Sequence, residues 1–231
     1  MRSTVSGVGV VDKTVAVLQA LEAEPRTLNE LAATTGIARA TAHRLAVALE
    51  VHGLVRRDDE GRFALGTRLI GLGREATEAI PLAVAARPAL ERLRDATGES
   101  VQLYLREGSR RVCVASLESP HGLRTIVPLG ASLPLDKGSA GRILRDTATT
   151  ASARAGNRDQ GFVESVGERE AGVASVSAPV WDAEGQIVAA VSVSGPIERT
   201  TRRPGRRYAD AVTAAARAVE HAAGLNDRTF A

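Results

Sequence analysis

The stretch from Thr27 to Gly66, TLNELAATTGIARATAHRLAVALEVHGLVRRDDEGRFALG, constrains the fold more than any other part of the chain. Thr27 and Glu30 have the spacing of a capping box, in which a hydroxyl and a carboxylate each satisfy a free backbone N–H group at a helix start. Gly36 is suited to end that helix, because glycine readily adopts the left-handed conformation of a C-terminal cap. A second helical pattern begins after two further residues. A helix, a short turn with glycine and another helix define a helix-turn-helix.

The second helix of this motif has one apolar face and several polar positions. Helical spacing predicts that four residues face the core, namely Ala42, Leu45, Ala46 and Leu49. The other faces carry the candidate DNA contacts Arg39, Ala40, Thr41, His43 and Arg44. In a major groove, arginine can bind the two acceptors of guanine, and threonine can bind a phosphate oxygen or the methyl group of thymine.

Two short strands are expected next, at residues 54–57 and 62–65, joined by a turn in which Gly61 supplies a positive φ angle. This hairpin is a predicted wing, and its candidate contacts to the phosphate backbone or the minor groove are Arg56, Arg57 and Arg62. A solvated helix face beside a charged hairpin is the simpler alternative, and the acidic tip of the hairpin argues against deep insertion into a groove. The succession of capping box, glycine turn, helix and wing favours DNA binding.

The composition limits the class of protein. Thirty Lys and Arg residues against 27 Asp and Glu give a net charge of only +3, so any surface for nucleic acid must be local. Cys113 is the only cysteine, which excludes an intrachain disulfide and makes an extracellular scaffold a poor interpretation. The N-terminus lacks the apolar run of a signal peptide, and the apolar stretches are too short to span a bilayer. These features predict a soluble, cytoplasmic protein with no membrane partner.

The chain divides into three predicted regions. Residues 1–66 form a DNA-binding domain, residues 67–87 a linker helix interrupted by Pro81, and residues 88–231 a domain of mixed helices and strands. In this last region we expect helices around Leu90, from the GSAG stretch to Arg145 and from Pro204 to Ala223, and strands at 101–106, 110–115, 123–129, 172–181 and 186–194. An antiparallel sheet flanked by helices gives an α+β fold.

Both halves of the chain resemble one family. The segments GVGVVDKTVAVLQAL, TLNELAATTGIARATAHRLAVALEVHGLVRR and GRFALG resemble the DNA-binding half of the IclR family of bacterial transcriptional regulators. The segment GEREAGVASVSAPVWDAEGQIVAAVSVSGP is similar to the C-terminal signature of that family. The sequences of the segments ATGESVQLY, KGSAG and SGPIERTTRRPGR resemble most the actinobacterial NdgR/LtbR subgroup of the IclR family. This subgroup is associated with leucine and other branched-chain amino acid metabolism.

The resemblance implies a winged helix-turn-helix joined by a linker helix to a GAF-like effector domain. It also implies a homodimer, or a tetramer of two dimers, on a palindromic double-stranded DNA operator, because two-fold protein symmetry matches a palindrome. By motif position, Arg39, Ala40, Thr41, His43 and Arg44 fall on the recognition helix. The small-molecule pocket implied by the same comparison is lined by Leu123, Ile126, Leu129, Leu133, Ser139, Ala140, Ser175, Ser192 and Ser194.

The segment Gly138–Gly141 suggests what kind of molecule this pocket binds. Free backbone N–H groups at a helix start favour a carboxylate, so the effector is expected to be a carboxylate or an amino acid. The alternative is that the segment is a tight turn and that the strand serines only satisfy local hydrogen bonds. The stretch 146–160 is short and low in apolar residues, where the family usually has additional helix. The sequence therefore does not predict a complete outer wall for the pocket, and part of this segment is expected to be disordered.

No pattern of catalytic or metal-binding residues is present. The GSAG stretch lacks the Lys-Ser/Thr ending of a phosphate-binding loop, and no nucleophile elbow accompanies a base and an acid. The four histidines, at 43, 52, 121 and 221, have no ligand spacing with Cys113, so we expect no metal, no cofactor and no enzymatic activity. Two other functions stay open: a metabolite sensor that acts through protein contacts, and a hydrolase that uses a pocket serine without an evident base.

Overall fold

The computed structural model describes residues 6–145 and 161–225. The segment 146–160, for which the sequence predicts disorder, lies outside the described residues. The chain divides into two compact units, Met1–Ala76 and Thr77–Ala231. Each unit has its own hydrophobic core and is described separately.

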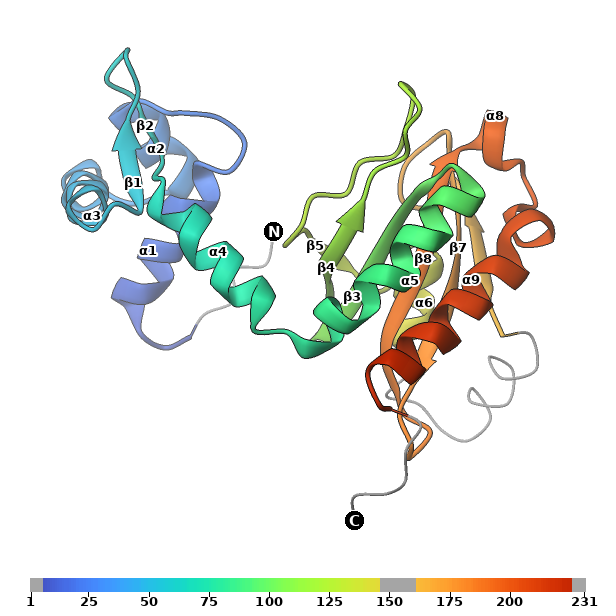
Figure 1. The fold of residues 1–231 in the computed structure, drawn as a ribbon. Helices are drawn as coiled ribbons and strands as arrows, with labels where there is room; N and C mark the ends of the chain where they lie inside the picture. The colour runs from blue at the N-terminus through green and yellow to red at the C-terminus, as the bar shows by residue number, and fades with distance from the viewer. Residues whose placement is uncertain (1–5, 146–160, 226–231) are drawn as a thin grey trace. The chain divides into compact units, whose positions relative to one another are not determined.

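The first unit is a three-helix domain with a two-stranded hairpin (Figure 1). Its elements are α1 (Gly9–Ala20), α2 (Leu28–Thr35), α3 (Arg39–Val51), β1 (Val55–Arg57) and β2 (Phe63–Leu65). The strands pair antiparallel, with Arg56 opposite Ala64. The core comprises Val17, Leu21, Leu31, Ala46, Leu49, Val55 and Phe63. This arrangement confirms the predicted winged helix-turn-helix.

The local signals in the sequence account for the helix ends. The Thr27 hydroxyl accepts a hydrogen bond from the Glu30 backbone, and the Glu30 carboxylate accepts one from the Thr27 backbone at 2.8 Å. This second hydrogen bond lowers the pKa of Glu30. Gly36 ends α2 in the left-handed conformation, with φ at 68°. The helix α1 begins at Gly9 without a side-chain cap, and the Asp12 carboxylate in its first turn accepts a hydrogen bond from the Ser6 backbone.

The connecting segment forms two helices. The helix α4 (Arg68–Glu78) contains the boundary between the two units, and α5 (Pro81–Thr97) belongs to the second unit. Pro81 begins α5, as expected of a residue without an N–H group. The helix continues through Pro88 and ends at Gly98, so no helix boundary falls at Arg87. The residue whose carbonyl Pro88 leaves without an intrahelical donor, Val84, is exposed and open to water.

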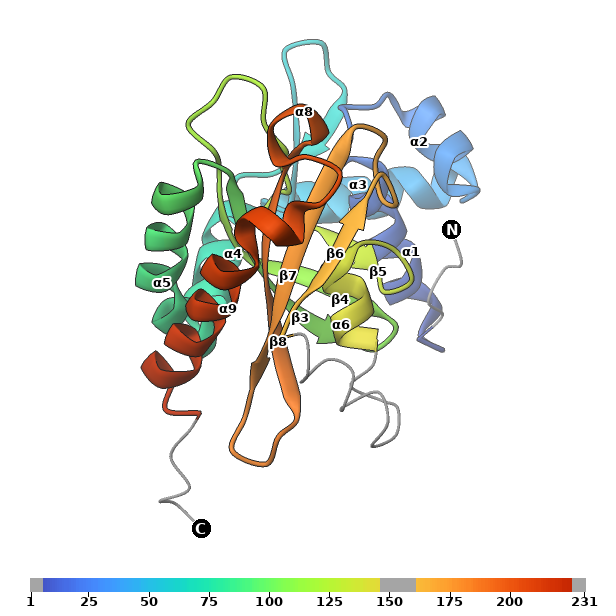
Figure 2. The ribbon, with the colours of Figure 1, turned by 90° about the vertical axis from the view of Figure 1, so that its right-hand side faces the viewer.

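The second unit is built on a six-stranded antiparallel sheet (Figure 2). The strands of the described part are β3 (Ser100–Glu107), β4 (Arg110–Leu117), β5 (Ser132–Pro134), β6 (Val163–Val166), β7 (Val173–Trp181) and β8 (Ile187–Pro196). They lie in the order β5-β4-β3-β8-β7-β6. The expected hairpin around Gly108 and the expected pair of long strands are therefore present, and the unit has the predicted α+β fold.

The two faces of the sheet are covered differently. Figure 1 shows α5 and α9 (Pro204–Ala222) side by side on one face, where they pack against the apolar residues of β3, β7 and β8. The helix α6 (Ser139–Arg145) lies on the other face, where Ile143 and Leu144 pack against Tyr104 and Cys113. The short helix α8 (Ile197–Thr200) follows β8.

The strand expected at 123–129 is not formed. Residues 118–131 form an irregular loop, and the strand at that edge of the sheet is the later β5, which pairs with β4 through Leu133 and Arg111. Leu123 is 69% exposed, Ile126 53% and Leu129 52%. Val127 of the same stretch is buried in the cluster beneath α6, and its carbonyl accepts a hydrogen bond from Ser116 Oγ at 2.7 Å. The stretch is therefore held by side-chain contacts and not by pairing with a neighbouring strand.

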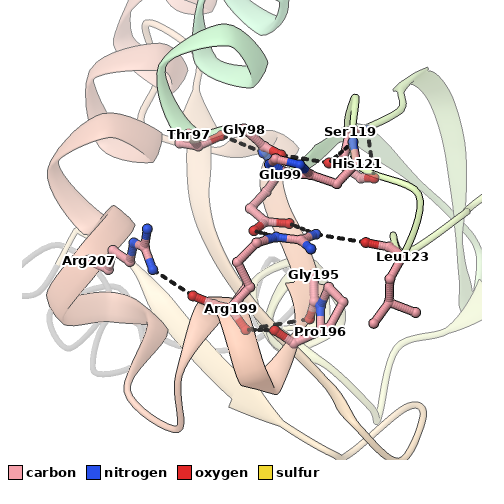
Figure 3. A network of polar contacts seen from close by, with 12 residues as sticks. Thr97, Gly98, Glu99, Ser119, His121, Leu123, Gly195, Pro196, Arg199 and Arg207 are labelled. Carbon is pink, nitrogen blue, oxygen red and sulfur yellow. Dashed lines mark hydrogen bonds and ion pairs between the residues drawn. The ribbon is translucent and has the colours of Figure 1, made fainter.

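A buried ion pair anchors this loop and α8 (Figure 3). The Glu99 side chain is 1% exposed and binds Arg199 through both of its oxygens, with Nη2 2.8 Å from Oε2. The same Nη2 donates to the Leu123 carbonyl at 2.9 Å, and the hydrogen bond to Glu99 raises the pKa of Arg199. A Cβ atom at position 195 would lie 2.2 Å from Glu99 Oε2, so glycine is required there.

We expect Glu99→Ala to lower the free energy of unfolding by about 1 to 3 kcal/mol, because it removes both charge-assisted hydrogen bonds to Arg199, whose side chain is 27% exposed and stays partly solvated. Urea unfolding of the second unit can be followed by the fluorescence of Trp181, the only tryptophan. The matched control is Glu118→Ala, which removes the half-exposed pair with Arg124 and costs less than about 1 kcal/mol. Equal losses in the two variants would contradict this account of the anchor.

Candidate nucleic-acid interface and effector site

The first candidate site is the exposed face of α3. Arg39, Ala40, His43 and Arg44 are exposed and Thr41 is half-buried, while Ala42, Ala46 and Leu49 are buried in the core. Arg39 Nε donates to Asn29 Oδ1 of α2 at 2.9 Å, which holds the two helices of the motif together. Among the described residues, neither His43 nor Arg44 has a hydrogen bond or an ion pair, so both side chains are available to a ligand.

The wing arginines differ from one another in what they contact. Arg56 is exposed and has no ion pair within the described part of the chain. Arg57 stacks on the Phe63 ring at 4.2 Å and pairs with Glu50. Arg62 pairs with Asp58 at 2.8 Å and with Glu60 at 3.1 Å, and the hydrogen bond to Asp58 raises its pKa. The acidic tip of the hairpin therefore already neutralises Arg62.

The second candidate site is a small cavity of about 20 Å³ in the second unit, between α6 and the sheet. Five of the nine predicted effector residues line it, namely Ser139, Ala140, Ser175, Ser192 and Ser194. Leu133 lies on β5 and packs against the cluster beneath α6. Leu123, Ile126 and Leu129 lie in the exposed loop 118–131 and do not line this cavity.

Three serines of this cavity form one hydrogen-bonded chain through the buried Ser177, whereas Ser194 donates to Gln102. Ser139 Oγ lies 2.7 Å from both Ser175 Oγ and Ser177 Oγ, and Ser177 donates to Ser192 at 2.9 Å. The chain follows from strand register, because Ser177 pairs with Ser192 and Ser175 pairs with Ser194 across β7 and β8. Ser177 is fully buried and was not predicted as a site residue. Its spacing of two from Ser175 could have indicated that both side chains lie on the same face of β7.

One of the backbone donors expected to hold a carboxylate is already bound by a carboxylate of the protein. Gly138 N donates to Glu168 Oε2 at 3.0 Å, and Glu168 Oε1 lies 3.3 Å from Arg142 Nη1. Glu168 belongs to the loop between β6 and β7. The Gly138–Gly141 segment forms the turn into α6, and Glu168 occupies its first backbone donor and pairs with Arg142 of the helix.

Six further polar residues, which the sequence analysis did not predict as site residues, line the cavity. They are Gln102, Tyr104, Arg111, Ser165, Arg169 and Glu170. Arg111 is 2% exposed, and its Cζ lies 5.3 Å from the centre of the Tyr104 ring. Burial raises the pKa of Tyr104 and lowers the pKa of Arg111. Alternation along the strands was the available signal, since Gln102 and Tyr104 alternate with the apolar core residues Val101 and Leu103.

Metal and thiol chemistry find no support in the described residues. Among them, no group of three or more His, Cys, Asp or Glu side chains could hold a metal ion. No helix in the same part of the chain is long and apolar enough to cross a membrane. Cys113 is fully buried between β4 and α6, and burial raises its pKa to about 12.

Fold and site together define a two-part protein, with a winged helix-turn-helix in one unit and a polar cavity on the sheet of the other. The model of the IclR helix-turn-helix domain matches residues 10–59. The model of the C-terminal domain of bacterial transcriptional regulators of the IclR type matches residues 74–157 and 155–221. Because these matches cover most of the chain, the protein belongs to the IclR family.

Individual relatives agree with the family. The chain is 25% identical over 212 residues to the HTH-type transcriptional regulator KipR of Bacillus subtilis, covering 80% of this chain and 85% of that protein. It is 28% identical over 219 residues to the glycerol operon regulatory protein of Streptomyces coelicolor, covering 83% of this chain and 86% of that protein. An IclR homolog of Microbacterium hydrocarbonoxydans, whose structure was solved with 4-hydroxybenzoate, has the same fold, with a TM-score of 0.78 at 20% identity. The match covers 93% of this chain and 99% of that protein.

These relatives are transcriptional regulators and not enzymes, which confirms the prediction that the chain is not an enzyme. The protein is a DNA-binding transcriptional regulator of the IclR family with a small-molecule effector domain. The α+β architecture expected from the sequence is also that of the solved IclR structures.

The buried thiol gives a direct test of the core beneath α6. With its pKa raised to about 12, Cys113 is protonated at pH 8, and we expect it to react with a disulfide reagent at least about 100-fold more slowly than a free cysteine. In denaturant the single thiol should react at the ordinary rate, which serves as the control. Rapid labelling of the folded protein would show that the α6 face is open.

Proposed function

We propose that α3 reads a palindromic operator in the major groove, with Arg44, Thr41 and His43 nearest the base edges and Arg39 near a phosphate. The observation that carries the proposal is an exposed helix face whose Arg44 and His43 have no partner among the described residues, on a unit that matches the family's DNA-binding domain. Small Ala40 allows close approach. Arg56 contacts the backbone, while Arg57 and Arg62 chiefly stabilise the wing through their own pairs.

Two copies of the chain, or a tetramer of two dimers, would place two recognition helices on the two half-sites. Exposed apolar side chains in the first unit support association, namely Val10, Val11 and Val15 of α1 and Ile70 and Leu72 of α4. We propose residues 1–66 as the DNA-binding domain, 67–87 as the linker and 88–231 as the effector domain. Effector binding changes the balance between two arrangements of the paired winged helices through this linker.

The effector is a small molecule with a carboxylate, and Ser139, Ser175, Ser192 and Ser194 orient it. Hydroxyl groups that already hydrogen-bond one another can exchange partners for a polar ligand. The solved relative with 4-hydroxybenzoate supports a carboxylate as a ligand of this fold. From the resemblance of the ATGESVQLY and KGSAG segments, we place the target genes in leucine or related amino acid metabolism, and the protein in the cytoplasm.

Arg44→Ala is expected to weaken binding to a promoter fragment by about 10- to 100-fold, because an arginine on a guanine contributes about 1 to 3 kcal/mol of discrimination. The fragment is selected from genomic DNA with the purified protein, and affinity is measured by fluorescence anisotropy. Arg92→Ala, at an exposed position of α5, is the matched control and should leave the affinity unchanged.

The salt dependence of the same assay separates DNA binding from the alternative of a sensor that acts through protein contacts. Each phosphate contact contributes about 0.9 to the slope of log affinity against log salt. We expect a steep slope for the native protein and a slope smaller by about one for Arg56→Ala. If no genomic fragment is enriched, or if Arg44→Ala binds as tightly as the native protein, the operator assignment is wrong.

A further inference from the structure

The cavity in the second unit contains a buried positive charge that no carboxylate of the described chain pairs with. Arg111 of β4 is 2% exposed. Its Nη1 donates to the backbone carbonyls of Lys137, at 2.8 Å, and Pro134. Its Nε is buried, and no described residue accepts from it. A guanidinium stays charged when buried, so its position in the interior is costly unless an anion joins it.

A second buried donor lines the same cavity. Gln102 of β3 is 1% exposed, and its Oε1 accepts a hydrogen bond from Ser194 at 3.1 Å. Its Nε2 is buried and has no acceptor among the described residues. Gln102 lies on the sheet beside Ser192, its cross-strand partner, and both residues line the cavity. An unpaired amide nitrogen in a buried polar site is costly and is usually satisfied by a ligand or by water.

Two other groups of this cavity that could donate to a ligand already have hydrogen-bond partners in the protein. Gly138 N is bound by Glu168, and Ser139 Oγ belongs to the serine chain. The cavity also contains Arg169, which pairs with Glu170 at 3.4 Å, so its charged lining is two arginines and one carboxylate. Asp136 attracts the Arg111 guanidinium electrostatically but forms no ion pair with it among the described residues. Because Arg111 is 2% exposed, its charge attracts an anion more strongly than the same charge at the surface.

We propose that Arg111 and Gln102 bind the carboxylate of the effector, and that this pair restricts the site to anionic ligands. Arg111 supplies the charge, and the Gln102 amide supplies a second buried donor in the lining of the same cavity. The cavity of about 20 Å³ holds about one water molecule, so a carboxylate enters it by displacing water and moving the side chains of the lining. The inference rests on the proposed function in that it concerns the effector site, but it makes no use of DNA binding.

Formate and acetate are the probes, because they are carboxylates of the smallest size. Thermal unfolding and calorimetric titration of the full-length protein are run with each sodium salt, and with formamide and acetamide as uncharged matches, at ionic strength kept constant with sodium chloride. A ligand that binds only the folded state raises Tm in a saturable way. We expect saturable binding of formate and acetate and none of the two amides.

Arg111→Gln should weaken anion binding at least 10-fold, and Gln102→Met at least threefold. Arg110→Gln is the matched control, because Arg110 lies next to it on β4 with an exposed side chain that donates to Ser132. This variant should bind formate as the native protein does. Should Arg111→Gln fail to fold, Arg111→Lys replaces it, and a loss of at least fivefold is expected because lysine cannot form the two-pronged contact.

Absence of saturable binding to the native protein, or equal affinity in the Arg111 and Arg110 variants, would overturn the proposal. Both outcomes are distinguishable from failure of the proposed function. Promoter affinity measured without any carboxylate tests the recognition helix alone, and we expect Arg111→Gln to retain it within about twofold. A native protein that binds its promoter but no carboxylate would refute only the anion site.

Discussion

The two-sided burial of the central strands β3, β7 and β8 is the constraint on which the second unit depends. Successive side chains of a strand point to opposite faces, so one strand can serve two environments at once. Val101, Leu103 and Val193 pack against α5 and α9, while Gln102, Tyr104 and Ser192 face α6. The apolar face supplies the stabilising core, and the polar face supplies the cavity. A shift of register by one residue would exchange them.

This constraint explains what the sequence could predict. The helix-turn-helix is specified by local signals, namely the capping box at Thr27, the left-handed Gly36 and the turn at Gly61, and all three are present. The strands β7 and β8 follow from alternation over long stretches. The strand predicted at 123–129 is wrong because this stretch belongs to a loop, whose carbonyls accept side-chain hydrogen bonds from Arg199 and from Ser116 of β4 instead of pairing along a strand.

The candidate site was less predictable than the fold, for a related reason. The serines at 139, 175, 192 and 194 came from a resemblance of motifs, and they do line one cavity. Arg111 and Gln102 lie on strands far away in the sequence, and they reach this cavity only through the pairing of β3 with β4 and β8. Pairing register is a property of the folded sheet, so no local pattern indicates that a particular arginine is buried.

The arginines of the molecule show that charge acquires a role from its surroundings. Arg62 and Arg199 bind carboxylates of the chain itself, so they stabilise a wing and a loop. Arg44 is solvated and has no described partner, and it can exchange water for DNA at little cost. Arg111 is desolvated and has no carboxylate partner among the described residues, so its burial destabilises the folded state. An anion bound beside it would offset part of this desolvation free energy. The same side chain therefore stabilises structure in Arg62 and Arg199, and in our proposals it recognises DNA in Arg44 and selects a ligand in Arg111, depending on which acceptors the fold leaves beside it.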